Sequence, residues 1–358
     1  MNIEKIRAKT YEIFTDKLLL ISAALILTLS FFGFFPTIKA SQIVPIFLLW
    51  VLFVAVKALE ESKFLNYLAL RLDSKEFVPQ KMILIAFLFS LILSIDVTLI
   101  ILLPLTLLLK VKNRVTLFIL VAFTTHLGAA LTPFGTPQNL FIFSYYHISI
   151  LEFIKIMAPF SFGMLILFFA LSFLVKEPKK SALPKIEYDS YKAIFSISIL
   201  IFAIIVSMHI LPWYFGFIVL LLAFYIEKRA LDVDYALLFT FTLFIILSNQ
   251  FKALLSPYFS EIKEPFFITI ILSQFISNVA ATLFLHNFTS NYAALLLGSN
   301  VGSFGTPIAA LANLITYKIY ISKEGKKSNF LYTLTLWGFG VLGVGILLII
   351  YLQNDIIT

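Results

Sequence analysis

Residues 127–139 read Leu127-Gly-Ala-Ala-Leu-Thr-Pro-Phe-Gly-Thr-Pro-Gln-Asn139, and this polar stretch interrupts a long apolar run. The apolar segments 115–123 and 140–146 flank it. Lipid cannot satisfy a broken backbone, so such a break is tolerated at membrane depth only where protein buries it or where it lines a cavity. A second break, Gly298-Ser-Asn-Val-Gly-Ser-Phe-Gly-Thr-Pro-Ile308, lies near the other end. Paired interruptions in two halves of a chain indicate the binding site of a transporter.

The composition predicts an integral membrane protein. Hydrophobic residues make up 61% of the chain, charged residues 13%, and the mean hydropathy is +1.00, whereas soluble domains carry roughly 25% charged residues. The apolar runs are continuous rather than alternating, which predicts helices and not a barrel. The chain has no cysteine, which excludes disulfides, thiolate metal sites and thiol catalysis. The net charge of +8 does not indicate nucleic acid, because the basic residues lie between apolar runs, where topology explains them.

The alternation of apolar and charged segments predicts two halves of an all-α membrane protein, with about nine spans and two re-entrant hairpins. In chain order we expect a cytoplasmic lead-in (1–17), a first half (18–175) with a hairpin (82–109) and a broken helix (115–146), a cytoplasmic linker (176–192), and a second half (193–354) with a hairpin (265–288) and a broken helix (291–320).

The basic clusters all fall on one side of this arrangement, which predicts a cytoplasmic N-terminus and an outside C-terminus in the inner or plasma membrane. The order span, span, hairpin, broken helix, span then occurs twice in opposite orientations. That order predicts an inverted-topology repeat with the broken helices at the membrane midplane. Between the halves, residue identity is limited to a Gly-Thr-Pro triplet at 135–137 and 305–307.

Asp96 lies in the middle of the first predicted hairpin, within Ser94-Ile-Asp-Val-Thr98. A charged group inside the membrane is costly and marks a functional site by default. The carboxylate could ligate a cation, carry a proton, or cap the second arm of the hairpin. The corresponding tip, with Ser277, Asn278 and Thr282, is neutral.

The tips and breaks are expected to meet, so that half-helix N-termini and exposed carbonyls face one cavity. No lysine or arginine lies in any tip or break, which favours a weakly charged anion, a neutral oxyacid or a cation as ligand. His126, just before the first break, is a weaker candidate for a proton relay. The candidate ion- and substrate-binding residues are Ser94, Asp96, Thr98, Thr132, Gly135, Thr136, Asn139, Ser277, Asn278, Thr282, Asn300, Gly302, Gly305 and Thr306.

An intramembrane enzyme fits the sequence poorly. An aspartyl protease needs two carboxylates that share one site, and only Asp96 is placed deep in the membrane. A serine hydrolase needs a serine–histidine pair, and Ser94 with His126 lacks a Gly-x-Ser-x-Gly turn. There is no phosphate-binding P-loop, so drive by ATP would need a separate ATPase subunit.

The tips and breaks together resemble one known superfamily of ion transporters. The residues that carry this resemblance are Ser94-Ile-Asp-Val-Thr-Leu99 with Pro104, Leu131-Thr-Pro-Phe-Gly-Thr-Pro-Gln-Asn-Leu140, Ser277-Asn-Val-Ala-Ala-Thr282 and Gly298-Ser-Asn-Val-Gly-Ser-Phe-Gly-Thr-Pro307. The superfamily contains arsenite pump membrane subunits, Na⁺/H⁺ antiporters of the NhaD type, citrate–metal carriers and divalent-anion/Na⁺ symporters. The chain looks most similar to short permeases of the arsenite and NhaD type.

The resemblance implies a scaffold domain, a transport domain that moves by an elevator-type mechanism, and a homodimer formed through the scaffold. In the divalent-anion symporters the paired Ser-Asn-Thr tips and the following breaks hold two Na⁺ ions and the substrate carboxylates. Here that pattern implies Na⁺ at Ser94, Asp96, Ser277 and Asn278. The first tip departs from it, because Ile95 and Asp96 stand where the symporters have an asparagine.

The sequence therefore predicts a secondary active transporter that moves a small inorganic or organic anion with Na⁺ or H⁺ coupling. The alternative is a Na⁺/H⁺ antiporter in which Asp96 carries the ion and the proton. Apart from Na⁺ as coupling ion, we expect no cofactor. The expected partners are membrane lipid and the transported ion.

Overall fold

The computed structural model describes residues 19–71, 77–109, 111–176, 188–258, 261–324 and 329–357. The lead-in 1–17 and most of the linker 176–192 lie outside the described residues. Within the described ranges the regular structure is entirely helical. The helices are Leu19–Phe31, α2 (Ala40–Glu61), α3 (Phe64–Arg71), α4 (Val78–Ile92), α5 (Ile95–Leu108), α6 (Arg114–Ala130), α7 (Pro137–Tyr145), α8 (Ile150–Ser172), α9 (Ser190–Ser207), η1 (Trp213–Phe215), α10 (Gly216–Ile226), η2 (Lys228–Leu231), α11 (Tyr235–Leu255), α12 (Pro265–Ile276), α13 (Asn278–Leu285), η3 (His286–Phe288), α14 (Tyr292–Val301), α15 (Leu311–Glu324) and α16 (Phe330–Ile357).

Long apolar helices make this a multi-pass membrane protein. Five described helical segments are long and apolar enough to cross a membrane. Other apolar helices, among them α4, α5, α12 and α14, are shorter than a full span. The five segments are Ala40–Glu61, Ile150–Ser172, Ser190–Ser207, Lys228–Leu255 and Phe330–Gln353.

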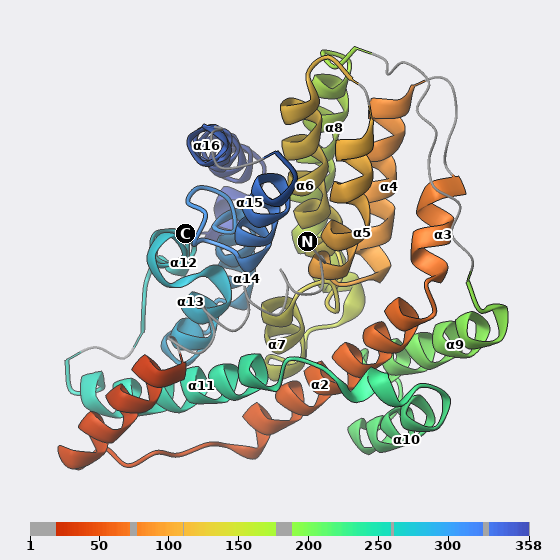
Figure 1. The fold of residues 1–358 in the computed structure, drawn as a ribbon. Helices are drawn as coiled ribbons and strands as arrows, with labels where there is room; N and C mark the ends of the chain where they lie inside the picture. The colour runs from red at the N-terminus through yellow and green to blue at the C-terminus, as the bar shows by residue number, and fades with distance from the viewer. Residues whose placement is uncertain are drawn as a thin grey trace.

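The helices form two groups, which we call the base and the body (Figure 1). The base consists of α2, α9, α10 and α11, with α2 packed against the other three. The body consists of α4–α8 and α12–α16 and lies above the base in this view. Contacts between the groups are made by α2 with α7 and by α11 with α13. Segments from both halves of the sequence thus build each group.

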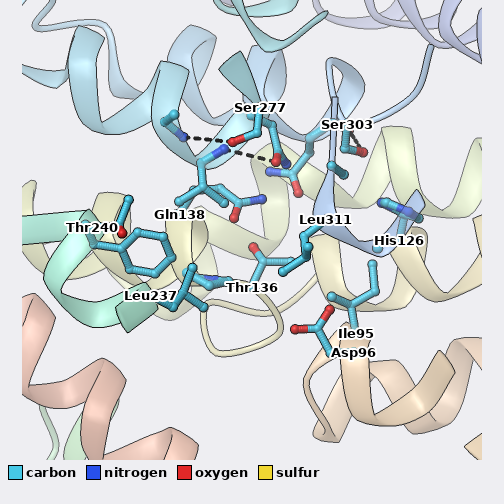
Figure 2. Close-up of a pocket in the computed structure, with 18 of the residues that line it drawn as sticks. Ile95, Asp96, His126, Thr136, Gln138, Leu237, Thr240, Ser277, Ser303 and Leu311 are labelled. Carbon is cyan, nitrogen blue, oxygen red and sulfur yellow. Dashed lines mark hydrogen bonds between the residues drawn. The ribbon is translucent and has the colours of Figure 1, made fainter. Parts of the chain in front are cut away.

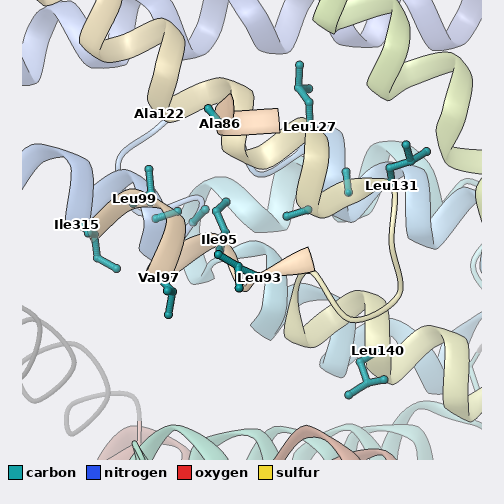
Figure 3. Packing of buried hydrophobic residues seen from close by; sticks show 14 of the residues in the cluster. Ala86, Leu93, Ile95, Val97, Leu99, Ala122, Leu127, Leu131, Leu140 and Ile315 are labelled. Carbon is teal, nitrogen blue, oxygen red and sulfur yellow. The ribbon is translucent and has the colours of Figure 1, made fainter. Parts of the chain in front are cut away.

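The body contains two pairs of short consecutive helices, α4 with α5 and α12 with α13. Ser94 precedes the first residue of α5, and Ser277 separates α12 from α13 with a φ of +79°. Hydrophobic side chains of α5 are buried against α6 and α15, as Figure 3 shows for Leu99 and Ile315. Burying a leucine-sized side chain contributes about 1.5–3 kcal/mol relative to water. Within the bilayer, where lipid is also apolar, close packing rather than burial from water holds these short helices in place.

Each pair is followed by an interrupted helix. The first ends as α6 at Ala130 and resumes as α7 at Pro137, whose missing N–H suits the first position of a helix. The second ends as α14 at Val301 and resumes as α15 at Leu311. Both expected breaks in residues 115–146 and 291–320 are therefore present as gaps between helices.

Glycines bring the first segment of each interrupted helix against the first helix of the preceding pair, α4 or α12. A Cβ on Gly128 of α6 would lie 2.1 Å from Ser90 Oγ and 2.2 Å from the Phe87 carbonyl oxygen of α4. A Cβ on Gly302, just after α14, would lie 2.9 Å from Ser273 Oγ of α12. Small residues at such contacts let helix backbones approach closely inside a membrane.

We predict that Gly128→Ala lowers the apparent melting temperature of the protein in detergent. The added methyl group overlaps a backbone carbonyl, and overpacking of this kind costs about 1–3 kcal/mol. The matched control is Gly340→Ala in α16, where a Cβ meets nothing within 4 Å. Thermal unfolding of both variants followed by intrinsic fluorescence checks the prediction, and equal melting temperatures would contradict it.

Candidate functional site

A cavity of about 80 Å³ lies where the body meets the base. It is lined by the first residues of four helices: α5 through Ile95 and Asp96, α7 through Pro137, α13 through Asn278 and α15 through Leu311. Figure 2 shows side chains converging on this space, with Ser277 and Ser303 above it and Asp96 below. Helix α11 of the base closes one side, so the cavity has walls from both groups.

The four helix starts give the cavity a particular electrostatic character. The N-terminus of a helix carries free N–H groups and a partial positive charge, which together favour anions. The lining residues include no lysine and no arginine, and Asp96 is the one acidic residue among them. The cavity therefore combines partial positive charge from backbone with one carboxyl group. Such a site can hold an oxyanion, or a cation at the carboxyl group.

Two asparagines hold the breaks in shape. Asn139, in the first turn of α7, donates from Nδ2 to the carbonyl oxygens of Ala129 at 3.2 Å and Thr132 at 3.3 Å. Asn313, in the first turn of α15, donates from Nδ2 to the carbonyl oxygens of Ser303 at 2.9 Å and Thr306 at 3.3 Å. The two asparagines thus reach back over the same spacing in the two breaks. Each asparagine donates hydrogen bonds to carbonyl oxygens that no helix satisfies. Such carbonyls need a partner in apolar surroundings.

A backbone hydrogen bond joins each hairpin tip to the break that follows it. The Ile95 N–H donates to the Gly135 carbonyl at 3.4 Å, and the Asn278 N–H donates to the Ala309 carbonyl at 2.8 Å. Gly135 and Ala309 stand at the same spacing after Thr132 and Thr306. The tip and the break of each half are therefore built on one plan.

This plan corrects the expected correspondence between the two Gly-Thr-Pro triplets. Pro137 of the first triplet begins α7, whereas Pro307 of the second lies within the break, before α15 begins at Leu311. The hydrogen bonds instead pair Thr132-Pro133 with Thr306-Pro307. What the breaks share is a Thr-Pro pair followed at fixed spacing by an asparagine that bonds back to the threonine carbonyl. The two Gly-Thr-Pro triplets therefore do not occupy equivalent positions in the two breaks.

The second break is held by an additional side chain. Gln274 of α12 donates from Nε2 to the carbonyls of Gly302 and Phe304, both at 3.0 Å, and accepts from the Thr306 N–H at 2.9 Å. Gly305 has a φ of +106°, and its missing Cβ leaves room for this amide, because a Cβ there would lie 2.2 Å from Gln274 Oε1. Leu91 occupies the corresponding place in α4. The first break therefore has fewer side-chain hydrogen bonds than the second.

Six of the sequence-predicted residues line the cavity: Asp96, His126, Thr136, Ser277, Asn278 and Asn300. The others lie outside its lining. Ser94 precedes α5, and the hydroxyls of Thr98 and Thr282 bond to carbonyls of their own helices. The remaining ones belong to the breaks or to the first turn of α7, namely Thr132, Gly135, Asn139, Gly302, Gly305 and Thr306. Binding roles for all these residues stay predictions.

The lining also includes residues that the sequence did not single out. Gln138 lies at the start of α7 and Ser303 in the second break, and their place within the quoted polar stretches was the available signal. Thr240 and Phe241 come from α11, which reads as an ordinary apolar helix and gives no signal. A residue on the base can be identified as lining the cavity only once the two groups are placed together.

Several buried polar atoms at the cavity have no hydrogen-bond partner among the described residues. They are His126 Nε2, Thr136 Oγ1 and Gln138 Oε1. Buried polar groups are paired in the great majority of cases, because an unpaired one costs roughly 1–3 kcal/mol. The Thr136 and Gln138 oxygens, on residues that line one cavity, are suited to a polar ligand or to water.

Comparison with known proteins places the chain in a family. A family model described as citrate transporter (CitMHS) matches residues 11–293. A protein of Methanocaldococcus jannaschii, named as an uncharacterized transporter, is 34% identical over 298 residues, which cover 76% of this chain and 80% of the relative. The inner membrane protein YbiR of Escherichia coli (strain K12) is 31% identical over 255 residues, which cover 66% of this chain and 68% of the relative. The matched region includes both pairs of short helices, the first break and the linker. With these matches the chain belongs to the citrate transporter family, a family of membrane transporters.

Proposed function

We propose that this protein is a secondary active transporter that moves a small inorganic or organic anion across the inner or plasma membrane. The observation that carries the proposal is the convergence of four helix starts on one cavity without a lysine or arginine. Broken helices whose N-termini face an anion are how many membrane carriers bind charged substrates. The unpaired Thr136 and Gln138 oxygens would complete the ligand shell of an oxygen-rich substrate that carries hydroxyl or protonated carboxyl groups.

Asp96 supports coupling of this transport to Na⁺ or H⁺. Its carboxyl group stands in the first turn of α5 and lines the cavity into which an anion would enter. Two negative groups repel each other in a medium of low dielectric constant, so a cation or a proton must accompany the anion. The same residue supports the alternative of a Na⁺/H⁺ antiporter, in which Asp96 carries the ion and the proton and no anion is moved.

The matching hydrogen bonds of the two breaks support an inverted repeat. The order of short helix pair, interrupted helix and long helix occurs as α4–α8 and again as α12–α16. With the basic loops inside, the proposed arrangement has about nine spans, two re-entrant hairpins, a cytoplasmic N-terminus and an outside C-terminus. In this scheme the base is a scaffold and the body is a transport domain that carries the cavity past it.

We predict that an anion which the protein transports raises its melting temperature. A ligand that binds only the folded state stabilises it by about 2.7 kcal/mol at a hundredfold excess over its dissociation constant. The screen covers citrate, sulfate, phosphate and arsenite, each with Na⁺ or with choline as cation. Uptake of the stabilising anion into proteoliposomes then checks transport. A Na⁺-driven pH change in vesicles without any of these anions would favour the antiporter instead.

We predict that Asp96→Asn abolishes cation-coupled transport and leaves insertion and folding intact. The amide keeps the size of the side chain but cannot carry a proton or balance a cation. Initial uptake rates in proteoliposomes with and without a Na⁺ or pH gradient give the measurement, and Asp232→Asn, between η2 and α11, is the control. Wild-type rates and wild-type ion dependence in purified Asp96→Asn protein would refute the assigned role.

The proposed movement requires contacts between body and base to break. One such contact is the hydrogen bond from Ser248 Oγ of α11 to the Phe284 carbonyl of α13, at 2.6 Å. Because the chain has no cysteine, a pair introduced as Ser248→Cys and Phe284→Cys can be oxidised selectively. We predict that oxidation of this pair stops transport and that reduction restores it.

The matched control for this cross-link lies within the base. Ser196 Oγ of α9 donates to the Ala58 carbonyl of α2 at 3.1 Å, which is a similar contact between two base helices. Oxidation of a Ser196→Cys and Ala58→Cys pair should therefore leave the uptake rate unchanged. Full transport by the oxidised α11–α13 pair, with the disulfide verified by mass spectrometry, would exclude movement at this contact.

A further inference from the structure

A pair of side chains links the two breaks across the centre of the body. Asn300 of α14 donates from Nδ2 to Asn139 Oδ1 of α7 at 2.8 Å, and both side chains are buried. The pair therefore joins the second interrupted helix to the first. Asn139 keeps its Nδ2 for the carbonyls of the first break, so its Oδ1 is the atom that remains to accept.

The common plan of the breaks identifies a second pair at the equivalent place. His126 precedes Thr132 by the same number of residues as Asn300 precedes Thr306, and Asn313 corresponds to Asn139. His126 lies on α6 and Asn313 on α15, so this pair also crosses between the halves. The Asn313 side chain lies within hydrogen-bonding reach of the His126 ring, and neither His126 Nε2 nor Asn313 Oδ1 has another partner among the described residues. Both pairs therefore link a polar side chain of one half to an asparagine of the other.

The orientation of Asn313 determines how His126 can be protonated. The Nδ2 group of Asn313 donates to the carbonyls of Ser303 and Thr306, which fixes its Oδ1 as an acceptor. An acceptor beside an imidazole favours the tautomer that carries hydrogen on the facing nitrogen. Nε2 is the buried ring nitrogen without another partner, which makes it the expected donor to Asn313, as Nδ2 of Asn300 is the donor in the other pair. The remaining nitrogen, Nδ1, is left as the basic atom of the ring.

We propose that His126 is the proton-accepting group of the cavity and that its protonated imidazole holds an oxygen of the transported anion, with Asn313 selecting the tautomer. This inference rests on the proposed function and specifies H⁺ as a coupling ion. It also specifies a substrate that offers a carboxylate or another oxyanion. The proton binds at Nδ1, and no covalent bond other than this N–H is made or broken.

The surroundings of His126 make proton and anion binding depend on each other. The ring is 6% exposed and packs against the rings of Phe123 and Phe304, at 6.4 and 5.1 Å between centroids. An isolated positive charge in such a place is strongly disfavoured, and a paired one much less so. The anion therefore promotes protonation, and by thermodynamic linkage the proton promotes anion binding to the same degree.

Few other charged groups face this position. Asp96 on α5 is the one other titratable residue in the cavity lining. The lining from α7, α11, α13, α14 and α15 consists of uncharged residues, among them Gln138, Thr240 and Asn300. When a singly charged anion is bound, one protonated imidazole balances its charge and a neutralised Asp96 adds none, so the loaded cavity is neutral.

The tautomer can be measured without any knowledge of the substrate. The chain has four histidines, so the ¹⁵N-histidine signal that disappears in His126→Asn assigns His126 in nanodisc-embedded protein. We expect hydrogen on Nε2 and a bare Nδ1 at alkaline pH in the wild type, and a mixture of tautomers in Asn313→Leu. Hydrogen on Nδ1 in the wild type, or an unchanged tautomer in Asn313→Leu, would overturn the proposal. This result stands even if no anion in the screen binds and the proposed function fails.

The coupling is measured as the ratio of citrate uptake with an inward proton gradient to uptake at equal pH. We expect His126→Asn, which recreates the side-chain types of the Asn139–Asn300 pair, to lower the gradient-dependent part of this ratio about tenfold or more, because one charge-assisted hydrogen bond is lost. His209→Asn, an exposed histidine at the end of α9, is the control. His126→Gln is the second variant should the first fail to fold. A ratio in folded His126 variants equal to that of the wild type would overturn the proposal.

Discussion

The structure depends on one constraint, which is that every backbone N–H and C=O exposed by a broken helix must find a partner where no water is available. Asn139 and Asn313 meet it in the same way, by turning the side-chain amide of a first helical turn back onto the carbonyls of the preceding break. The hairpin tips add one N–H each, from Ile95 and Asn278. With these bonds made, the carbonyls are satisfied and the helix starts remain available to a ligand.

The two halves satisfy the constraint to different degrees, and the difference lies in one residue of the hairpins. Gln274 in α12 bonds to three backbone groups of the second break, whereas Leu91 stands at its counterpart in α4. Thr306 Oγ1 accordingly donates to the Gln274 carbonyl, while Thr132 Oγ1 has no partner among the described residues. The first break also contributes the unpaired Thr136 and Gln138 oxygens. The half with fewer internal bonds is therefore the one that offers more to a ligand.

Local sequence patterns predicted the parts of the site that are local in cause. The breaks within 115–146 and 291–320 and the polar tips between apolar runs are each dictated by the backbone near them. The correspondence between the breaks was misjudged, because it depends on where Asn139 and Asn313 send their amides and not on an identical triplet. The sequence also did not predict that α11 lines the cavity, because Thr240 lies on a helix whose sequence suits any apolar contact.

The lack of lysine and arginine in the lining is consistent with the demands of a carrier under the proposed mechanism. A fixed positive charge would bind the anion tightly but would have to return through an apolar environment alone, at high cost. Helix starts attract an anion with partial charges only and leave no net charge behind. Asp96 is then the group that makes the empty site charged, and the proton or cation that neutralises it enters and leaves with the anion. A cavity with backbone dipoles and groups that titrate can thus be neutral when loaded and release its cation together with the anion, which a cavity built on arginine cannot.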